Sequence, residues 1–478
     1  MTIQDGKEIK RRANNEIEGQ QSQKEKDVMT QRNPEQKDMA TGVELFKESG
    51  TMSDIISTVL GFESACVELS VSKPTYIENM LEREKQNNVL EFQEHMHLYL
   101  AGDHPQLTTA RITDDDCLVL YKTLEANRYV RSIDLRYNVI TDKGAAILGT
   151  LLEVNKFIEE INIMCNDFGG PGAVAIAQAL HTNTTLKVLR LNGNKMGNKG
   201  GMAFAQALQI NSTLESLDIG DADLTIECLI ALATVLRENR TLKALNVNRP
   251  LLWTVQEEPT DHFTRMIKVN KGLKELHMQK FNMRDFGACR FAENLVHNFT
   301  LTYLNLNCNR ITRDGTKELA KVLKLNTGLK VLDLGYNRLE DDGAIYLAEA
   351  LGTYNTTLEC LNIVYNNIGP KGLCAIADAL SLNSALTSLY IWGNHFDDAV
   401  CQAFSSHLHS ERLQAGATDI QSYVVDGKVY LCLTGPGMRA HYYYAPIFGD
   451  DVPEWQIRGE HIQRADHKVP ITNRENEL

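Results

Sequence analysis

The sequence has few of the features that mark a secreted, membrane-bound or cofactor-dependent protein. It contains 10 cysteines but no C-x-x-C pair, and no apolar secretory segment near its start. We therefore expect free thiols in a reducing, intracellular compartment. A membrane-spanning helix is not predicted either, because no run reaches the roughly 18 apolar residues that such a helix needs.

Motifs for catalysis and metal binding are equally scarce. The phosphate-binding pattern G-x-x-x-x-G-K-[ST] does not occur, and His95 and His97 lack partners at zinc-ligand spacing. Cys165 and Cys308 have no accompanying His/Asp arrangement that would make either of them a nucleophile. The sequence thus predicts no enzyme activity, no metal and no cofactor.

The net charge of the chain indicates which class of macromolecule it is expected to bind. The chain carries 62 acidic against 49 basic residues, a formal charge of -13. An acidic surface repels phosphate backbones, so direct binding of nucleic acid is not expected. A protein partner is favoured, and a basic one would suit the overall charge.

The sequence does contain an internal repeat. The template L-x-x-L-x-L-x-x-N-x-L fits ten segments, which start at Val130, Ile158, Leu186, Leu214, Leu242, Leu273, Leu301, Leu329, Leu358 and Leu386. Their spacing is 28 residues except for two steps, of 31 and 29. A degenerate earlier copy is predicted as well, because Leu107 and Ile112 stand 28 residues before Leu135 and Ile140.

Each segment predicts a strand followed by a helix. The L-x-L alternation is typical of a short strand with one buried face, and apolar residues at helical spacing follow it. The template asparagine should satisfy backbone groups of the neighbouring coil. A second asparagine recurs where each helix ends, as at Asn155 and Asn211, and should close the helix in the left-handed conformation. One unit alone cannot offset its ordering entropy, so the units must stack.

The remaining segments predict caps and tails. We expect a disordered tail at 1–50, a helical N-terminal cap at 51–106, the repeat array at 107–412, a β-hairpin cap at 413–445 and a polar tail at 446–478. The hairpin is predicted from the alternating stretch around Asp426-Gly427.

The period and the N-x-L motif resemble the ribonuclease-inhibitor type of leucine-rich repeat. This resemblance covers roughly residues 100–410 and implies an α/β solenoid, or horseshoe, with a parallel sheet on the concave face and helices on the convex face. The modest cysteine content departs from ribonuclease inhibitors, and the template asparagine is replaced by Ala222, Pro250 and Phe281 in three adjacent repeats.

Irregular segments extend the resemblance to one group within this repeat class. These segments are "LNVNRPLLWTVQEE", "LYIWGNHFDDAVC" and "VVDGKVYLCLTGPGMRAHYYY". The group is non-enzymatic, so the resemblance implies a protein-binding scaffold or adaptor in the cytoplasm. It also implies two alternatives, a structural component of the ciliary axoneme and a nuclear or nucleolar regulator in proliferating or differentiating cells. A regulator of a GTPase or of a ribonuclease is a further alternative.

Candidate partner-binding residues follow from the expected concave face. Residues flanking the core leucines should point into the concavity, and the candidates among them are Arg136 and Arg190 together with an aromatic group. The aromatic group consists of Tyr303, Tyr336, Tyr365, Tyr390 and Trp392, all on or beside the inner face of the last four repeats. Aromatic side chains dominate interface energetics, so this group predicts a partner site, although covering the sheet is the alternative.

The irregular repeat provides a second candidate. The stretch from Asn248 to Asp261 is three residues longer than its counterparts and contains Trp253. A longer loop on a solenoid rim often binds a partner, whereas Trp253 folded into the core would make it a local defect. Both interpretations remain open at this point.

Overall fold

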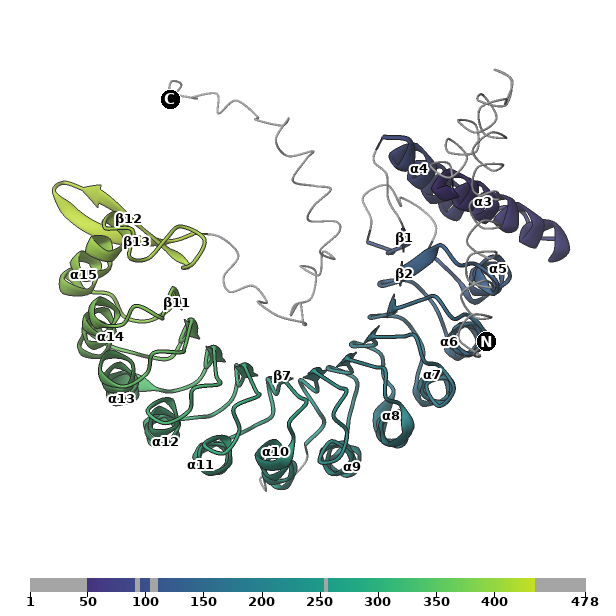
Figure 1. Cartoon of the computed structure of the whole chain (residues 1–478). Helices are drawn as coiled ribbons and strands as arrows, with labels where there is room; N and C mark the ends of the chain where they lie inside the picture. Colours follow the sequence, from purple (N-terminus) through teal and green to yellow (C-terminus); the bar gives the residue numbers. More distant parts are fainter. Residues whose placement is uncertain (1–49, 91–94, 104–110, 253–256, 435–478) are drawn as a thin grey trace, which may run out of the picture.

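A curved solenoid forms the body of the molecule, with strands on its inner side and helices on its outer side (Figure 1). The structure is a computed structural model that describes residues 50–90, 95–103, 111–252 and 257–434. The tails expected at 1–50 and 446–478 therefore lie almost wholly outside the described residues. The arrangement confirms the predicted α/β leucine-rich-repeat horseshoe.

Within the described residues, eleven strands form one parallel sheet in sequence order. They are β1 (Met96–Tyr99), β2 (Val130–Asp134), β3 (Glu160–Asn162), β4 (Val188–Arg190), β5 (Ser216–Asp218), β6 (Ala244–Asn246), β7 (Glu275–His277), β8 (Tyr303–Asn305), β9 (Val331–Asp333), β10 (Cys360–Asn362) and β11 (Ser388–Tyr390). Equivalent template positions pair throughout; Leu276 of β7, for example, lies opposite Leu304 of β8.

Each strand is followed by a helix of the outer layer. These helices are α5 (Asp114–Leu124), α6 (Asp142–Val154), α7 (Gly170–Ala179), α8 (Gly197–Ile210), α9 (Ile226–Val235), α10 (Glu258–Val269), α11 (Asp285–Leu295), α12 (Arg313–Leu323), α13 (Glu340–Thr353), α14 (Pro370–Leu382) and α15 (Asp398–His409). Their apolar stripes join the strand leucines in a continuous core. The helices touch closely enough that a Cβ on Gly172 of α7 would lie 2.8 Å from the Cβ of Ala145 in α6.

The template asparagines connect consecutive coils. Asn166 donates through Nδ2 to the carbonyl of Leu135 in the preceding coil at 3.0 Å, and its Oδ1 accepts the N–H of Ile140 at 3.1 Å. The same pattern recurs at Asn194, which donates to the carbonyl of Ile163 at 2.9 Å. These buried amides satisfy turn groups that the strands leave unpaired, so the predicted ladder is present.

A second ladder runs along the helix ends, with a geometry that differs from the prediction. Asn155 and Asn211 are extended, with φ of -72° and -67°, and do not adopt the left-handed conformation. The reason is that each side chain reaches across to the preceding coil. Asn155 donates to the carbonyl of Leu124 at 2.7 Å, while its Oδ1 accepts the N–H of Phe157 at 2.8 Å.

The N-terminal end also differs from the expected boundaries. A helical pair, α3 (Gly50–Glu68) and α4 (Thr75–Leu90), precedes the sheet, but β1 lies inside the segment expected to be a helical cap. Leu98 of β1 pairs with Ile133, so the degenerate first strand stands seven residues before the position that Leu107 implied. Leu107 itself lies outside the described residues.

The C-terminal end carries an antiparallel hairpin of β12 (Ile420–Val425) and β13 (Lys428–Leu433), which turns at Asp426 and Gly427. It lies beside α15, and Ile420 and Leu431 bury their side chains there in the main core. The hairpin therefore covers the apolar surface that the last repeat would otherwise expose.

Candidate functional site

Side chains flanking the core leucines are packed together more tightly than the sequence suggested. Within this inner row, His277 and Tyr303 meet edge to face with ring centroids 4.8 Å apart, and His277 Nε2 lies 2.7 Å from Glu275 Oε1. All three residues are buried. Adjacent parallel strands lie only about 4.8 Å apart, so long side chains in one row pack against each other.

Arg136 and Arg190 belong to this buried row and lie far from the aromatic group. Arg136 is 3% exposed; its Nε lies 3.6 Å from Asp134 Oδ2, and its guanidinium donates to the Tyr99 hydroxyl at 3.0 Å. Arg190 is 9% exposed and lies 3.6 Å from Glu160. Burial raises the pKa of Asp134 to about 7, although Arg136 opposes this shift. Both arginines thus engage carboxylates within the sheet.

The structure divides the five aromatic residues into two sets. Tyr303 and Tyr390 are buried, at 0% and 3% exposed, in a small apolar cluster with Val331 and Cys360. This inner set covers the sheet, which is the alternative that the sequence left open. The other three residues lie at the turns that follow the strands.

This outer set, Tyr336, Tyr365 and Trp392, is called the rim aromatic cluster. Tyr336 and Tyr365 are 49% and 44% exposed, and their rings stack at 4.6 Å with an interplanar angle of 16°. Trp392 is half-buried and packs on Phe396. A stacked aromatic pair contributes about 0.5–1.5 kcal/mol beyond its buried area, so the two exposed tyrosines form a stable apolar surface.

Backbone geometry explains why the tyrosines project. Tyr336 and Tyr365 have φ of 53° and 51°, in the left-handed region that turns the chain out of each strand. Their amides donate to the carbonyls of Val364 and Trp392 at 2.8 and 2.9 Å, which fixes each turn to the next coil. Gly393 occupies the same turn position in the last repeat. A Cβ there would lie 2.3 Å from Cδ1 of Tyr365, so the glycine leaves room for the ring.

The irregular central repeat contributes to the same rim. Trp253 lies outside the described residues, so the structure does not place it. Pro250 is buried at the turn, and Ala222 and Phe281 are buried at the equivalent positions in the two adjacent repeats. Phe281 meets Phe263 of α10 edge to face at 6.1 Å. In these three repeats apolar packing takes the place of the asparagine ladder.

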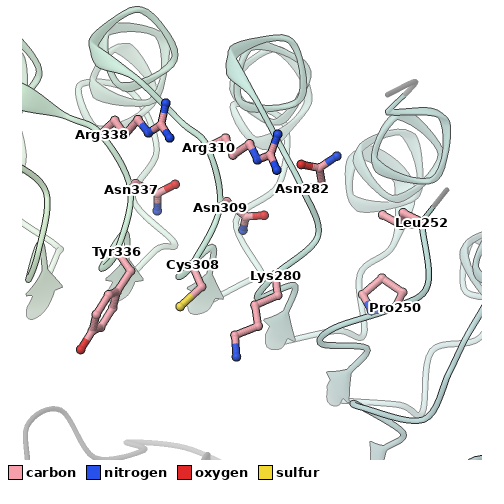
Figure 2. Close-up of a pocket in the computed structure, with 10 residues that line it drawn as sticks. All are labelled: Pro250, Leu252, Lys280, Asn282, Cys308, Asn309, Arg310, Tyr336, Asn337 and Arg338. Carbon is pink, nitrogen blue, oxygen red and sulfur yellow. The ribbon is translucent and has the colours of Figure 1, made fainter. Parts of the chain in front are cut away.

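A pocket of about 550 Å³, here called the rim pocket, joins the irregular repeat to the rim aromatic cluster (Figure 2). It is lined by Pro250, Leu252, Lys280, Asn282, Cys308, Asn309, Arg310, Tyr336, Asn337 and Arg338. Figure 2 shows two rows of side chains: Lys280, Cys308 and Tyr336 extend to one side, and Arg310 and Arg338 to the other. The lining is open and polar, with apolar residues at its two ends.

The thiol in the rim pocket is poorly suited to act as a nucleophile. Burial raises the pKa of the Cys308 thiol, so the sulfur is held in its protonated, poorly nucleophilic form. Among the described residues, no group of three or more His, Cys, Asp or Glu side chains could hold a metal ion.

None of the described helices has the length and apolar character needed to cross a membrane.

Sequence reasoning missed the three basic residues of the rim pocket. Lys280, Arg310 and Arg338 stand in the turns after β7, β8 and β9, outside the strand positions from which inward-facing side chains are expected. A signal was present, since Arg310 and Arg338 are one 28-residue period apart. The turn positions of the repeat therefore carry a pattern of their own beside that of the strands.

Comparison with known families agrees with this geometry. The sequence pattern described as Leucine Rich repeat matches residues 126–148, 154–177, 182–205, 297–320, 325–348 and 354–377. The chain is a leucine-rich-repeat protein. Repeats of this kind are generally protein-interaction scaffolds, so protein binding is the general function of the fold.

This leucine-rich-repeat protein is similar to leucine-rich repeat-containing protein 34 of Mus musculus and of Homo sapiens. The identities are 44% and 41% over 205 residues, which cover 43% of this chain and 49% and 44% of those proteins. The chain thus matches about half the length of these curated relatives. A solved structure of an internalin from Listeria monocytogenes shares 18% identity over 62% of this chain and 82% of that one, with a TM-score of 0.34.

Proposed function

We propose that this leucine-rich-repeat protein is a non-enzymatic scaffold or adaptor that binds protein partners on the C-terminal half of its rim. The observation that carries the proposal is the stacked and exposed pair Tyr336–Tyr365. Large aromatic surfaces are rarely left in water without a role, and tyrosine is among the residues that contribute most to interface energy.

The neighbouring surface has the other features of an interface. Trp392 adds a half-buried aromatic side chain in the next turn, and the rim pocket adds polar and charged groups beside Tyr336. Interfaces that bind reversibly combine an apolar centre with a polar margin in this way. The buried inner row, by contrast, offers little accessible surface, which favours the rim over the expected concave row.

The proposal is tested with a double variant, Tyr336→Ala and Tyr365→Ala. Partners are first identified by proximity labelling in the native cell and then bound to the purified full-length chain. We expect recovery of the partner to fall at least about tenfold, because two central aromatic contacts each contribute roughly 1–2 kcal/mol. The matched control is Tyr354→Ala, which removes a tyrosine of similar exposure at the end of α13.

Unchanged partner recovery by a double variant that unfolds at the wild-type temperature would refute the rim as the site. The same labelling experiment bears on location. Neighbours from an axoneme would support the structural alternative, and nuclear or nucleolar neighbours would support the regulatory one. Both placements remain predictions from sequence resemblance.

A further inference from the structure

The rim pocket is positively charged, whereas the molecule as a whole carries a net negative charge. The chain as a whole carries -13, yet the ten lining residues include Lys280, Arg310 and Arg338 and no acid. All three cations are exposed, and no ion pair joins any of them to another residue of the described chain. Some exposed arginines of the solenoid are paired, since Arg249 lies 2.9 Å from Asp221 and Arg313 lies 3.4 Å from Asp342, while others such as Arg237 are isolated; the rim pocket differs in bringing three such cations together.

The cations are positioned by the fold. The amides of Arg310 and Arg338 donate to the carbonyls of Met283 and Ile311 in the preceding coils, at 2.7 and 2.9 Å. This bonding fixes the two residues at equivalent positions of adjacent turns, and Figure 2 shows both side chains extending to the same side. Lys280 has φ of 53° and extends from the opposite row. A ligand in the pocket would therefore meet positive charge from both sides.

Between the two rows lie Asn309 and Asn337, whose side-chain amides are already hydrogen-bonded to the backbone. Nδ2 of Asn309 donates to the carbonyls of Met278 and Leu306, and its Oδ1 accepts the N–H groups of Phe281 and Met283. The floor is thus a rigid part of the solenoid, and recognition falls to the basic side chains above it. Rigid floors lower the ordering cost of binding.

Apolar groups bound the pocket at both ends. Pro250 and Leu252 stand at one end, and Tyr336 stands at the other, where it continues into the stack with Tyr365. The pattern is a short basic channel between two apolar contact points. An extended peptide segment fits along this channel and contacts both ends, whereas the surface of a folded protein would contact only the rim.

We propose that the rim pocket binds an acidic linear peptide of a partner protein, with carboxylates on Lys280, Arg310 and Arg338 and an apolar side chain against Tyr336. This inference rests on the proposed function and names the chemistry of the partner segment. Guanidinium groups pair with carboxylates in bidentate geometry, which gives specificity as well as attraction. Single-stranded RNA is the competing ligand, but the net charge of -13 disfavours a polyanion beyond the pocket itself.

The test uses the full-length chain and a displayed library of random twelve-residue peptides. Peptides selected by the wild-type protein are measured by fluorescence polarisation against wild type and against the double variant Arg310→Ser and Arg338→Ser. We expect the selected peptides to be net acidic, and their affinity for the double variant to fall about tenfold, as expected for the loss of two charge pairs. Raising the salt concentration should weaken wild-type binding more than the residual binding of the variant.

A control variant, Arg237→Ser and Lys268→Ser, removes the same charge from two exposed positions after α9 and in α10. It should bind the peptides like wild type. Selection of neutral or basic peptides, equal binding by the Arg310/Arg338 variant, or tighter binding of a poly-uridine oligonucleotide would each overturn the inference. If Tyr336→Ala with Tyr365→Ala abolishes partner recovery while Arg310→Ser with Arg338→Ser does not, the proposed function stands and this inference fails.

Discussion

At the scale of single residues, Asp333 shows how the repeat constrains ionisation. Its carboxylate accepts the N–H of Gly335 at 2.9 Å and the side-chain amide of Asn307 at 3.1 Å, but the group is buried. Burial disfavours the charged form more than these hydrogen bonds favour it, and the pKa of Asp333 is raised to about 6. The protein therefore holds a carboxylate that takes up a proton at mildly acidic pH.

This shift predicts a pH-dependent stability. The unfolded pKa of aspartate is about 3.9, so between pH 6 and pH 4 the folded state binds a proton that the unfolded state does not. The contribution of Asp333 to the free energy of unfolding should rise as the pH falls through this window, by about 1.4 kcal/mol per pH unit. Asp333→Asn should remove that slope, measured by urea denaturation from pH 8 to pH 4.

The comparison must be with wild type at each pH, because other carboxylates also titrate. An exposed control, Asp398→Asn in α15, should leave the slope as in wild type. Parallel curves for wild type and Asp333→Asn across the whole range would contradict the prediction.

Residue identity alone could not place the site within the repeat. The sequence correctly placed the leucines and the template asparagines, because their spacing reflects contacts that every coil makes. It could not separate the buried Tyr303 and Tyr390 from the exposed Tyr336 and Tyr365. That difference depends on which residue stands opposite in the next strand and on whether a position falls in the strand or in the left-handed turn after it.

At the scale of elements, the turns after the strands carry the rim aromatic cluster and the rim pocket, on which the proposed function rests. The turn after β11 contains Gly393, with φ of 79°, and the ring of Tyr365 occupies the space where a Cβ would stand. The helices and strands around it are fixed by the core, so the ring cannot be accommodated elsewhere without loss of the stack.

Gly393→Ala should therefore act on both stability and binding. The left-handed backbone and the close contact should lower the free energy of unfolding by about 1–2 kcal/mol. We also expect the Tyr336–Tyr365 stack to be displaced, with partner recovery falling toward that of the tyrosine double variant. Near-ultraviolet circular dichroism and denaturation measure the two effects. The control is Gly416→Ala, since Gly416 has φ of 91° but open space around its Cβ.

A stability loss for Gly393→Ala that merely equals that of Gly416→Ala, with the aromatic signal unchanged, would show that only the backbone matters. The sequence could not have indicated this contact. Glycine recurs at many positions of the repeat, and its role at Gly393 depends on a side chain 28 residues earlier in the chain.

At the scale of the whole molecule, each coil is stabilised by its contacts with the coils on either side. The helices of the outer layer pack on one another in order, and no element spans the described array. A terminal repeat without a cap would therefore leave its whole apolar face in solvent. The hairpin of β12 and β13 prevents this at the C-terminal end, where Leu431 is buried beside α15. The hairpin and its place at the end of the array were predictable from the turn residues, but the side chains that make the contact with α15, Ile420 and Leu431, were not.

Leu431→Ser should loosen that end first. Losing a buried leucine side chain costs about 2–4 kcal/mol locally, which is enough to expose α15 to solvent more often. Hydrogen–deuterium exchange should quicken in α15 and then α14, while α6 and α7 exchange as in wild type. Val424→Ser, at an exposed position close to the turn of the same hairpin, should leave every helix unchanged. Uniform acceleration along the whole chain would show that the solenoid opens as one unit instead.

The asparagine ladder has a consequence for how such a protein can change over generations. Each rung reaches back only to the coil before it, as Asn166 reaches to Leu135. A duplicated stretch of one full period would therefore meet a compatible neighbour on either side. Gene segments could be gained or lost by unequal crossing-over, and the separation between the pocket and either end would alter in increments of one strand spacing, about 4.8 Å.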